Sequence, residues 1–141
     1  MSEKPVTRPT ELTSFAQLLG ITRFGNFFAD SKTYIIRVTP TQEIANLFGT
    51  VHGGYLASVI DDSAGMLIFF LYGVNSAITA RSSPIEMKRA PRLNQPLTFT
   101  MRVTKETKTE IWVMGEVRDD AGRLVALTSR SSRWCKRTRR R

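Results

Sequence analysis

An α+β fold, with one antiparallel sheet curled around a single long helix, is predicted for this chain of 141 residues. Two observations predict it. The segment from residue 52 to residue 72 is apolar almost all round, and a helix of that kind must be enclosed by other structure. Two strand-like segments precede this helix and four follow it, so a single curved sheet is the partner that encloses it.

The part of the chain before the long helix predicts short elements. Thr10 can cap a helix that runs to Leu19 and ends at Gly20. Two strand-like segments separated by a turn at Asp30 and Ser31 follow. The predicted order is an arm at residues 1–9, a short helix with the apolar face Leu12, Phe15, Leu18 and Leu19, strands at residues 21–28 and 32–39, and an irregular loop at residues 40–50.

The long helix is predicted from about His52 to Tyr72, with Gly73 ending it. It is long enough to cross a membrane. However, Asp61 and Asp62 lie in its middle, and each acid costs roughly 2.5–3.5 kcal/mol at the centre of a bilayer. We therefore interpret the segment as a helix buried inside a protein, and we expect no membrane partner.

The remainder of the chain is predicted to form strands. Pro84 lacks a backbone N–H, so it indicates an edge strand or a bulge at that point. The sequence DDAG at residues 119–122 is typical of a hairpin turn. The four predicted strands are residues 76–89, 97–105, 111–118 and 123–134.

Length and charge predict one domain at residues 21–134, after an arm and short helix at residues 1–20 and before a basic tail at residues 135–141. The net charge is +9, but seven basic residues and no acid occur from Arg130 onward, which leaves only +2 for the rest. We interpret the tail as a solvated terminus. A tail that binds nucleic acid is the disfavoured alternative, because the rest of the chain is nearly neutral.

The cysteine and histidine content excludes several classes. Cys135 is the single cysteine and cannot form an internal disulfide, and residues 1–9 lack the apolar core of a secretory signal. A cytoplasmic location is therefore expected. His52 is the single histidine, so the ligand set of a zinc site is missing, and we expect no metal or other cofactor.

Glycines and acids in the long helix suggest chemistry at a carbonyl group. Gly53 and Gly54 would expose unpaired N–H groups at the helix start, where the dipole favours negative charge, and their lack of Cβ atoms would let a substrate carbonyl approach. Alternatively, they only shape a tight turn. Asp61 and Asp62 interrupt apolar surroundings, where a carboxylate needs a partner or a chemical role. We expect the chemical role for Asp61 and an ordinary partner for Asp62.

The spacing of these groups bears on assembly. Gly53 and Asp61 lie about 12 Å apart along one helix axis, whereas a nucleophile or base must act within about 3 Å of the carbonyl that the N–H groups hold. One helix cannot supply both groups to one carbonyl. Two antiparallel copies of the helix across a twofold axis can, so a homodimer with two identical composite sites is predicted.

Two further groups of residues are candidates for the site. His52 is either a general base or a hydrogen-bonded residue that supports the loop. Asn46, six residues earlier, can orient His52 or contact the acyl group. No serine or cysteine lies in a nucleophile-elbow pattern. A basic cluster near the end of the third strand suits the phosphates of a long anionic substrate, although the same charges also suit an exposed strand end. This cluster comprises Arg81, Lys88, Arg89 and Arg92.

The sequence NLFGTVHGG at residues 46–54, followed by Asp61, resembles the hot-dog-fold acyl-CoA thioesterases of the phenylacetate-pathway (PaaI-like) type. Their motif is N-x-x-G-x-x-H-G-G with an acid nine residues after the histidine. IEMKRAP at residues 85–91 and DDAGRLVA at residues 119–126 are similar to the family's strand after the helix and to its final hairpin. The resemblance spans residues 24–134. It implies a hot-dog fold and hydrolysis of an acyl-CoA, in which coenzyme A is part of the substrate.

The resemblance also implies roles for residues. Asp61 is the nucleophile or the base that activates water, and Gly53 donates its N–H to the thioester oxygen from the opposite subunit. Asn46 lies against the thioester or helps place water, and His52 supports the loop. A homodimer, paired into a dimer of dimers, is expected.

This sequence departs from the family pattern at two places. Gly65 stands where some members carry Thr or Ser, and Ser82 and Ser83 stand where many carry a Ser or a Thr–Asp pair. We expect one of these two serines to position water. The alternative to an enzyme is a hot-dog protein that binds acyl-CoA without turnover, as a sensor or carrier. A dehydratase is disfavoured because no second histidine is present, and the acyl group itself is not specified.

Overall fold

The computed structural model describes residues 11–73 and 77–137, with residues 78–80 described by their backbone only. Thr10, Ser76, the predicted arm at residues 1–9 and the end of the predicted tail lie outside the described residues. The described elements are α1 (Ser14–Leu18), β1 (Asn26–Phe28), β2 (Thr33–Val38), the 3₁₀ turn η1 (Gln42–Ile44), α2 (Gly53–Tyr72), β3 (Ala77–Arg81), β4 (Ile85–Met87), β5 (Leu97–Glu106), β6 (Glu110–Arg118), β7 (Leu124–Thr128) and β8 (Ser132–Lys136).

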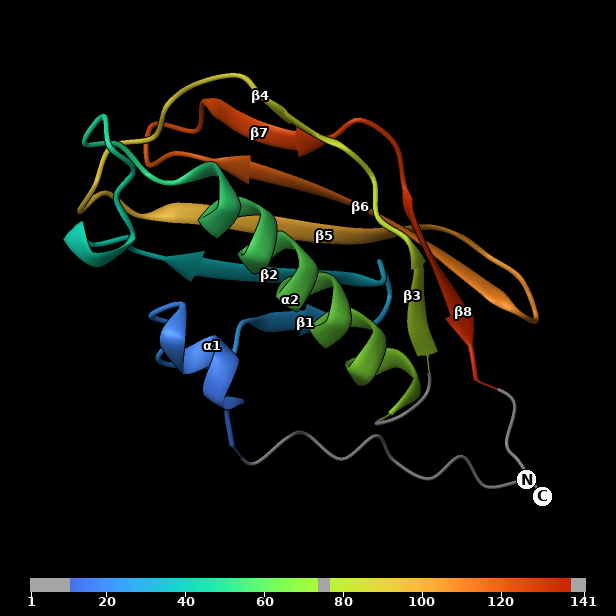
Figure 1. The fold of residues 1–141 in the computed structure, drawn as a ribbon. Coiled ribbons are helices and arrows are strands. Elements are labelled where there is room, and N and C mark those ends of the chain that lie inside the picture. Colours follow the sequence, from blue (N-terminus) through green and yellow to red (C-terminus); the bar gives the residue numbers. More distant parts are fainter. Residues whose placement is uncertain (1–10, 74–76, 138–141) are drawn as a thin grey trace.

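One antiparallel sheet contains the eight described strands. The main path runs β1-β2-β5-β6-β7-β4, and β8 pairs with both β6 and β3. Figure 1 shows this sheet curving behind α2, with α1 lying beside the helix near β1. The predicted α+β fold, with a curved sheet around a long helix, is confirmed.

The long helix α2 begins and ends where the sequence predicts. His52 is its N-cap, and the imidazole Nδ1 accepts the N–H of Gly54 at 2.9 Å. Gly73 ends the helix with a φ of 89°, a conformation that side chains with a Cβ rarely adopt. The helix packs against β2, β5 and β6. Its buried residues are Tyr55, Leu56, Val59, Ile60, Ser63, Ala64, Leu67 and Ile68.

Burial of α2 is one-sided within a single chain, and Figure 1 shows no described element over its outward side. Met66 and Phe69 are only half-buried, and Asp61 is exposed. The prediction that Asp61 is a buried acid is therefore wrong for the single chain, because Asp61 lies on the side of the helix that the sheet does not cover. That side therefore carries both an exposed acid and half-buried apolar side chains.

By length and composition α2 is also the one described helix that could cross a membrane. Eight of its 20 residues are nevertheless buried in the chain itself, at the centre of the hydrophobic core. This is the packing of a core helix, and it agrees with the prediction of a helix buried in protein.

Two of the predicted strands are each interrupted, and the two interruptions are hydrogen-bonded to each other. The predicted strand 76–89 becomes β3 and β4, and the predicted strand 123–134 becomes β7 and β8. Ser83 joins the two breaks, since its N–H donates to Ser132 Oγ at 2.9 Å and its Oγ accepts the N–H of Arg130 at 3.0 Å. The edge or bulge that Pro84 predicts is confirmed, because β3 and β4 lie at the edge of the sheet.

The short helix α1 is capped by Thr13, whose Oγ1 accepts the N–H of Ala16 at 3.1 Å. Ala16 is its buried residue. The predicted apolar face is wrong for Phe15 and Leu18, which are 52% and 79% exposed, whereas Leu12 and Leu19 do pack against the core. The small side chain of Ala16 allows α1 to lie close to the core. The hydroxyl of Tyr55 donates to the carbonyl of Leu19 at 3.0 Å and so ties the end of α1 to α2.

Candidate active site

The loop before α2 is shaped by the side chain of Asn46. Its Oδ1 accepts the N–H groups of Phe48 at 2.9 Å and Thr50 at 3.1 Å, and its Nδ2 donates to Thr50 Oγ1 at 2.9 Å. This pattern fixes a tight loop by replacing backbone partners with a side-chain amide. No hydrogen bond joins Asn46 to His52 in the described residues, so the predicted orientation of His52 by Asn46 does not occur within one chain.

The tip of this loop presents two large apolar side chains to water. Leu47 is 100% exposed and Phe48 is 88% exposed. Together these two side chains form an exposed apolar patch on the loop.

The helix start leaves one backbone donor free. Because His52 Nδ1 binds the N–H of Gly54, and the N–H groups of Tyr55 and Leu56 bind the carbonyl of His52, these three donors are taken. The N–H of Gly53 has no hydrogen-bond partner in the described residues. The structure therefore separates the two predicted donors, with Gly53 available to a ligand and Gly54 engaged. It also gives His52 the structural role of a helix cap.

The side-chain carboxylates of Asp61 and Asp62 have no ion pair or hydrogen bond within the described part of the chain. The ordinary partner expected for the Asp62 carboxylate is therefore not found. Partial burial in the surrounding protein raises the pKa of the Asp61 carboxyl above its ordinary value, although the residue is exposed. Burial also raises the pKa of Asp62, and the neighbouring charge of Asp61 raises it further. The two acids are thus unpaired groups whose charged forms are disfavoured, as is typical of functional sites.

A cleft of about 440 Å³, which we call the serine cleft, lies beside Asp61. Ser82 and Ser83 line it together with Met87 and Trp134. The structure thus brings Asp61 together with both predicted serines. Ser83 is buried and its hydroxyl is engaged in the break between strands. Ser82 is exposed, and its hydroxyl has no hydrogen bond in the described residues, so Ser82 is the serine that can hold water.

Met87 connects the serine cleft to the start of α2. A Cβ placed on Gly53 would lie 3.5 Å from Met87 Cε, which is ordinary van der Waals contact. Nothing in the sequence signals this contact, because it joins a helix start to an edge strand more than 30 residues later.

A second cleft of about 390 Å³, which we call the apolar cleft, shares Asp61 and Trp134 with the serine cleft. The indole Nε1 of Trp134 is buried and has no hydrogen-bond partner in the described residues. Sequence reasoning missed Trp134 and the segment around α1 as parts of the site. The other apolar residues of this cleft include Leu12, Ala16, Ile21, Phe24, Met66 and Phe69.

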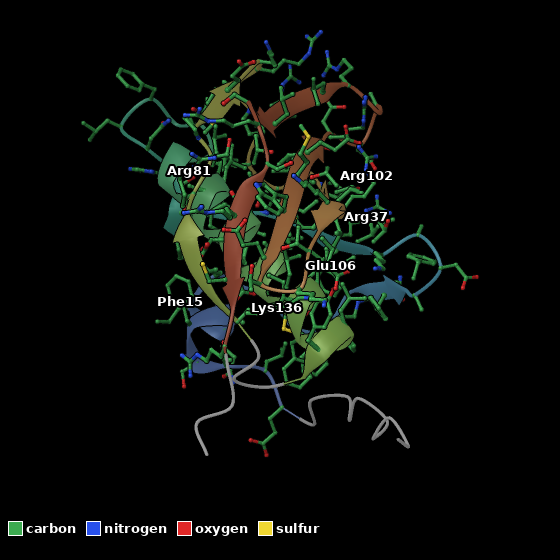
Figure 2. The ribbon with its side chains drawn as sticks, turned by 90° about the vertical axis from the view of Figure 1, so that its right-hand side faces the viewer. Phe15, Arg37, Arg81, Arg102, Glu106 and Lys136 are labelled. Atoms are coloured by element: carbon green, nitrogen blue, oxygen red, sulfur yellow. The ribbon has the colours of Figure 1, made fainter. Side chains whose placement is uncertain are left out.

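The predicted basic cluster is only partly brought together. Arg89 and Arg92 line a third cleft of about 580 Å³. Lys88 instead pairs with Glu86, with 3.0 Å between Nζ and Oε2. Arg81 lies at the end of β3 (Figure 2). It is not among the residues that line this cleft.

The basic segment at the end of the chain is partly engaged by acids of the sheet. Arg133 pairs with Glu110 at 3.1 Å, and Lys136 pairs with Glu106 at 2.7 Å. Among the described residues, no three His, Cys, Asp or Glu side chains gather in a way that could hold a metal ion.

A family model described as the thioesterase superfamily matches residues 48–126, a span that contains His52, Gly53 and Asp61. No curated protein sequence matches the chain significantly.

Several solved structures are similar in fold. The smu.793 protein from Streptococcus mutans, bound to acetyl CoA, has a TM-score of 0.75 at 19% identity, over 96% of this chain and 100% of that chain. A phenylacetic acid degradation-related protein from Ralstonia eutropha has a TM-score of 0.73 at 23% identity, over 91% of this chain and 92% of that chain. The PaaI protein of the E. coli phenylacetic acid degradation operon has a TM-score of 0.69 at 21% identity, over 86% and 87%.

Proposed function

The chain belongs to the thioesterase superfamily, and we propose that it hydrolyses an acyl-CoA to a carboxylic acid and coenzyme A. It is a thioester hydrolase with a hot-dog fold of the PaaI-like type. The observation that carries the proposed reaction is the occurrence, in one motif, of an unpaired N–H at Gly53 and an unpaired carboxylate at Asp61. The acetyl CoA bound to the similar S. mutans protein supports the substrate class.

The proposed chemistry uses both groups on one carbonyl. The N–H of Gly53 donates to the thioester oxygen and stabilises the negative charge that develops there. Asp61 either attacks the carbonyl carbon or takes a proton from the water that attacks it. If Asp61 attacks, the C–S bond breaks and leaves an acyl–Asp61 anhydride, which a water molecule then hydrolyses to the carboxylic acid and free Asp61. If Asp61 acts as the base, the water adds to the carbonyl carbon and the C–S bond then breaks. In both routes the departing thiolate of coenzyme A takes up a proton. No cofactor is needed for this reaction.

We propose that the two groups come from different protomers of a homodimer. Their separation of about 12 Å along one helix prevents them from meeting within a chain. The uncovered side of α2 and the exposed Leu47 and Phe48 support a second copy as their cover. By the family resemblance we expect these dimers to pair into tetramers.

Other residues have supporting roles in this proposal. Asn46 holds the loop and contacts the thioester across the interface, while His52 caps the helix that presents Gly53. Ser82 positions water beside Asp61. Arg89 and Arg92 bind the phosphates of coenzyme A, since guanidinium groups match phosphate oxygens. We place the protein in the cytoplasm, where its one free cysteine stays reduced.

Thiol release from aryl-, short- and long-chain acyl-CoAs tests the proposed function. We expect turnover with at least one of them, and Asp61→Asn should lower kcat by about 10²–10⁴. Asp62→Asn is the matched control, because it removes the neighbouring carboxylate and should keep most of the activity. Tight binding of every acyl-CoA without thiol release would instead indicate a sensor or carrier.

The pH profile supplies a second test of Asp61. Its carboxylate must be ionised to act, and its pKa is raised above 3.8 by burial. Activity should therefore fall on the acid side with an apparent pKa above 3.8. An Asp61→Glu variant with low but measurable activity gives the comparison. If its activity falls at the same acidic pH as that of the wild type, the titrating group is not Asp61.

A further inference from the structure

The lining of the apolar cleft combines buried hydrocarbon side chains with exposed acids. Ala16, Ile21 and Ile36 of this lining are buried, whereas Asp61 and Glu11 are exposed. Its volume of about 390 Å³ lies within the range of roughly 300–1,000 Å³ that small-molecule sites occupy. A molecule that binds in this cleft therefore leaves water for apolar surroundings.

The serine cleft on the same carboxylate differs in chemistry. Its walls carry five hydroxyl side chains, which are Ser58, Ser82, Ser83, Thr128 and Ser132. A thioester at Asp61 has two unlike halves. The coenzyme A half is anionic and well hydrated, while an alkyl or aryl acyl half is stabilised by leaving water. Of the two clefts that meet at Asp61, the apolar cleft is the one whose lining suits the acyl half, while the phosphates of coenzyme A are assigned to Arg89 and Arg92 of the third cleft.

Gly65 keeps the apolar cleft open. It lies in the wall of that cleft, on α2, about one helical turn after Asp61. A Cβ at this position would lie 3.7 Å from Cη2 of Trp134, which is ordinary contact. A methyl group would therefore fit, but a longer side chain would project into the space beside Trp134.

We propose that the apolar cleft between α1 and α2 receives the acyl group of the substrate, and that this group is apolar and larger than acetyl. Gly65 on α2 and Leu12 before α1 both line the cleft and determine the size that is accepted. The inference rests on the proposed thioesterase function and specifies the half of the substrate that the function leaves open.

Bulky substitutions at these two positions test the proposal. Gly65→Leu and Leu12→Phe should lower the ratio of kcat/KM for octanoyl-CoA or benzoyl-CoA over that for acetyl-CoA at least tenfold. Gly65→Ala should have a smaller effect. Leu18→Phe is the matched control on the same segment, because Leu18 is 79% exposed and does not line the cleft. Ratios within twofold of the wild type in both folded variants would overturn the inference and leave the proposed function standing.

A binding measurement separates the inference from catalysis. In a Trp112→Phe background Trp134 is the remaining tryptophan, so its fluorescence reports on the cleft. Octanoate and benzoate should change this emission saturably, whereas acetate should not, and Gly65→Leu should weaken the effect at least tenfold. Saturable binding without any thioesterase activity would keep the pocket and remove the proposed function. If none of the three acids changes the emission, the proposed acyl pocket is refuted. This test uses the protein without wall substitutions, so it holds even if the wall variants fail to fold.

Discussion

The charged side chains around the two ends of α2 differ in whether they are paired inside the chain. At its C-terminal end Lys136 lies over the ring of Tyr72, and Glu106 binds Lys32 at 2.8 Å and Lys136 at 2.7 Å (Figure 2). In its N-terminal half the carboxylate of Asp61 has no partner in the described residues, and neither has the N–H that begins the helix. Polar groups that are paired inside the chain stabilise the fold. Groups left unpaired are available to a substrate or a second protomer.

Substitution of Gly53 tests the unpaired N–H at the start of α2. Gly53→Pro replaces the N–H with a ring carbon and keeps the helix start, because proline is well tolerated at the first position of a helix and His52 already has the extended backbone that precedes proline. We expect kcat to fall about 10²–10³, the typical effect of losing one oxyanion donor. Thiol release with the best acyl-CoA measures it.

Gly53→Ala is the control for that prediction, since it keeps the N–H and its Cβ has only an ordinary contact with Met87. It should retain far more activity than the proline variant. Equal losses in two folded variants would assign the effect to shape and not to the donor.

Loss of the ion pairs of Glu106, near the C-terminal end of α2, should lower the stability of the fold. Burial alone raises the pKa of Glu106, but its bonds to Lys136 and Lys32 outweigh this and lower it to about 2 from 4.5. This carboxylate therefore stabilises the fold above pH 4.5, and the contribution is lost as pH falls towards 2. Because its side chain is still 24% exposed, we expect Glu106→Gln to cost only about 1–2 kcal/mol at pH 7.

Urea unfolding at pH 7, 4.5 and 3 measures this effect, and the gap between variant and wild type should shrink as pH falls. Glu116→Gln is the control, because Glu116 pairs with Arg118 on the exposed surface and should contribute little. A gap that stays constant from pH 7 to pH 3 would contradict the role of the Glu106 charge.

Substitution of His52 should change stability slightly and activity hardly at all. As the cap of α2, His52→Ala should lower the free energy of unfolding by about 1 kcal/mol, while His52→Asn keeps a capping side chain and most of that stability. Turnover per folded molecule should change little in either variant. A loss of a hundredfold or more in both would make His52 a general base instead.

Local patterns predicted the parts of the site that depend on neighbours along the chain. The start of α2 at His52, its end at Gly73 and the interruption at Pro84 all follow from capping and from backbone geometry. The sequence could not indicate which side of α2 the sheet covers, so the exposure of Asp61 was mispredicted. It also could not place Trp134 in the same two clefts as Asp61, because that depends on where the distant strand β8 lies relative to the helix.

Complementation between two inactive variants tests whether each active site is built from two protomers. Asp61→Asn and Gly53→Pro chains are unfolded together, refolded as a mixture and assayed for thiol release. If each site takes its carboxylate from one protomer and its N–H from the other, random pairing leaves about a quarter of the sites intact. Activity should therefore recover to about a quarter of the wild-type value, while each variant refolded alone stays inactive. A mixture no more active than its two parents would contradict the shared site.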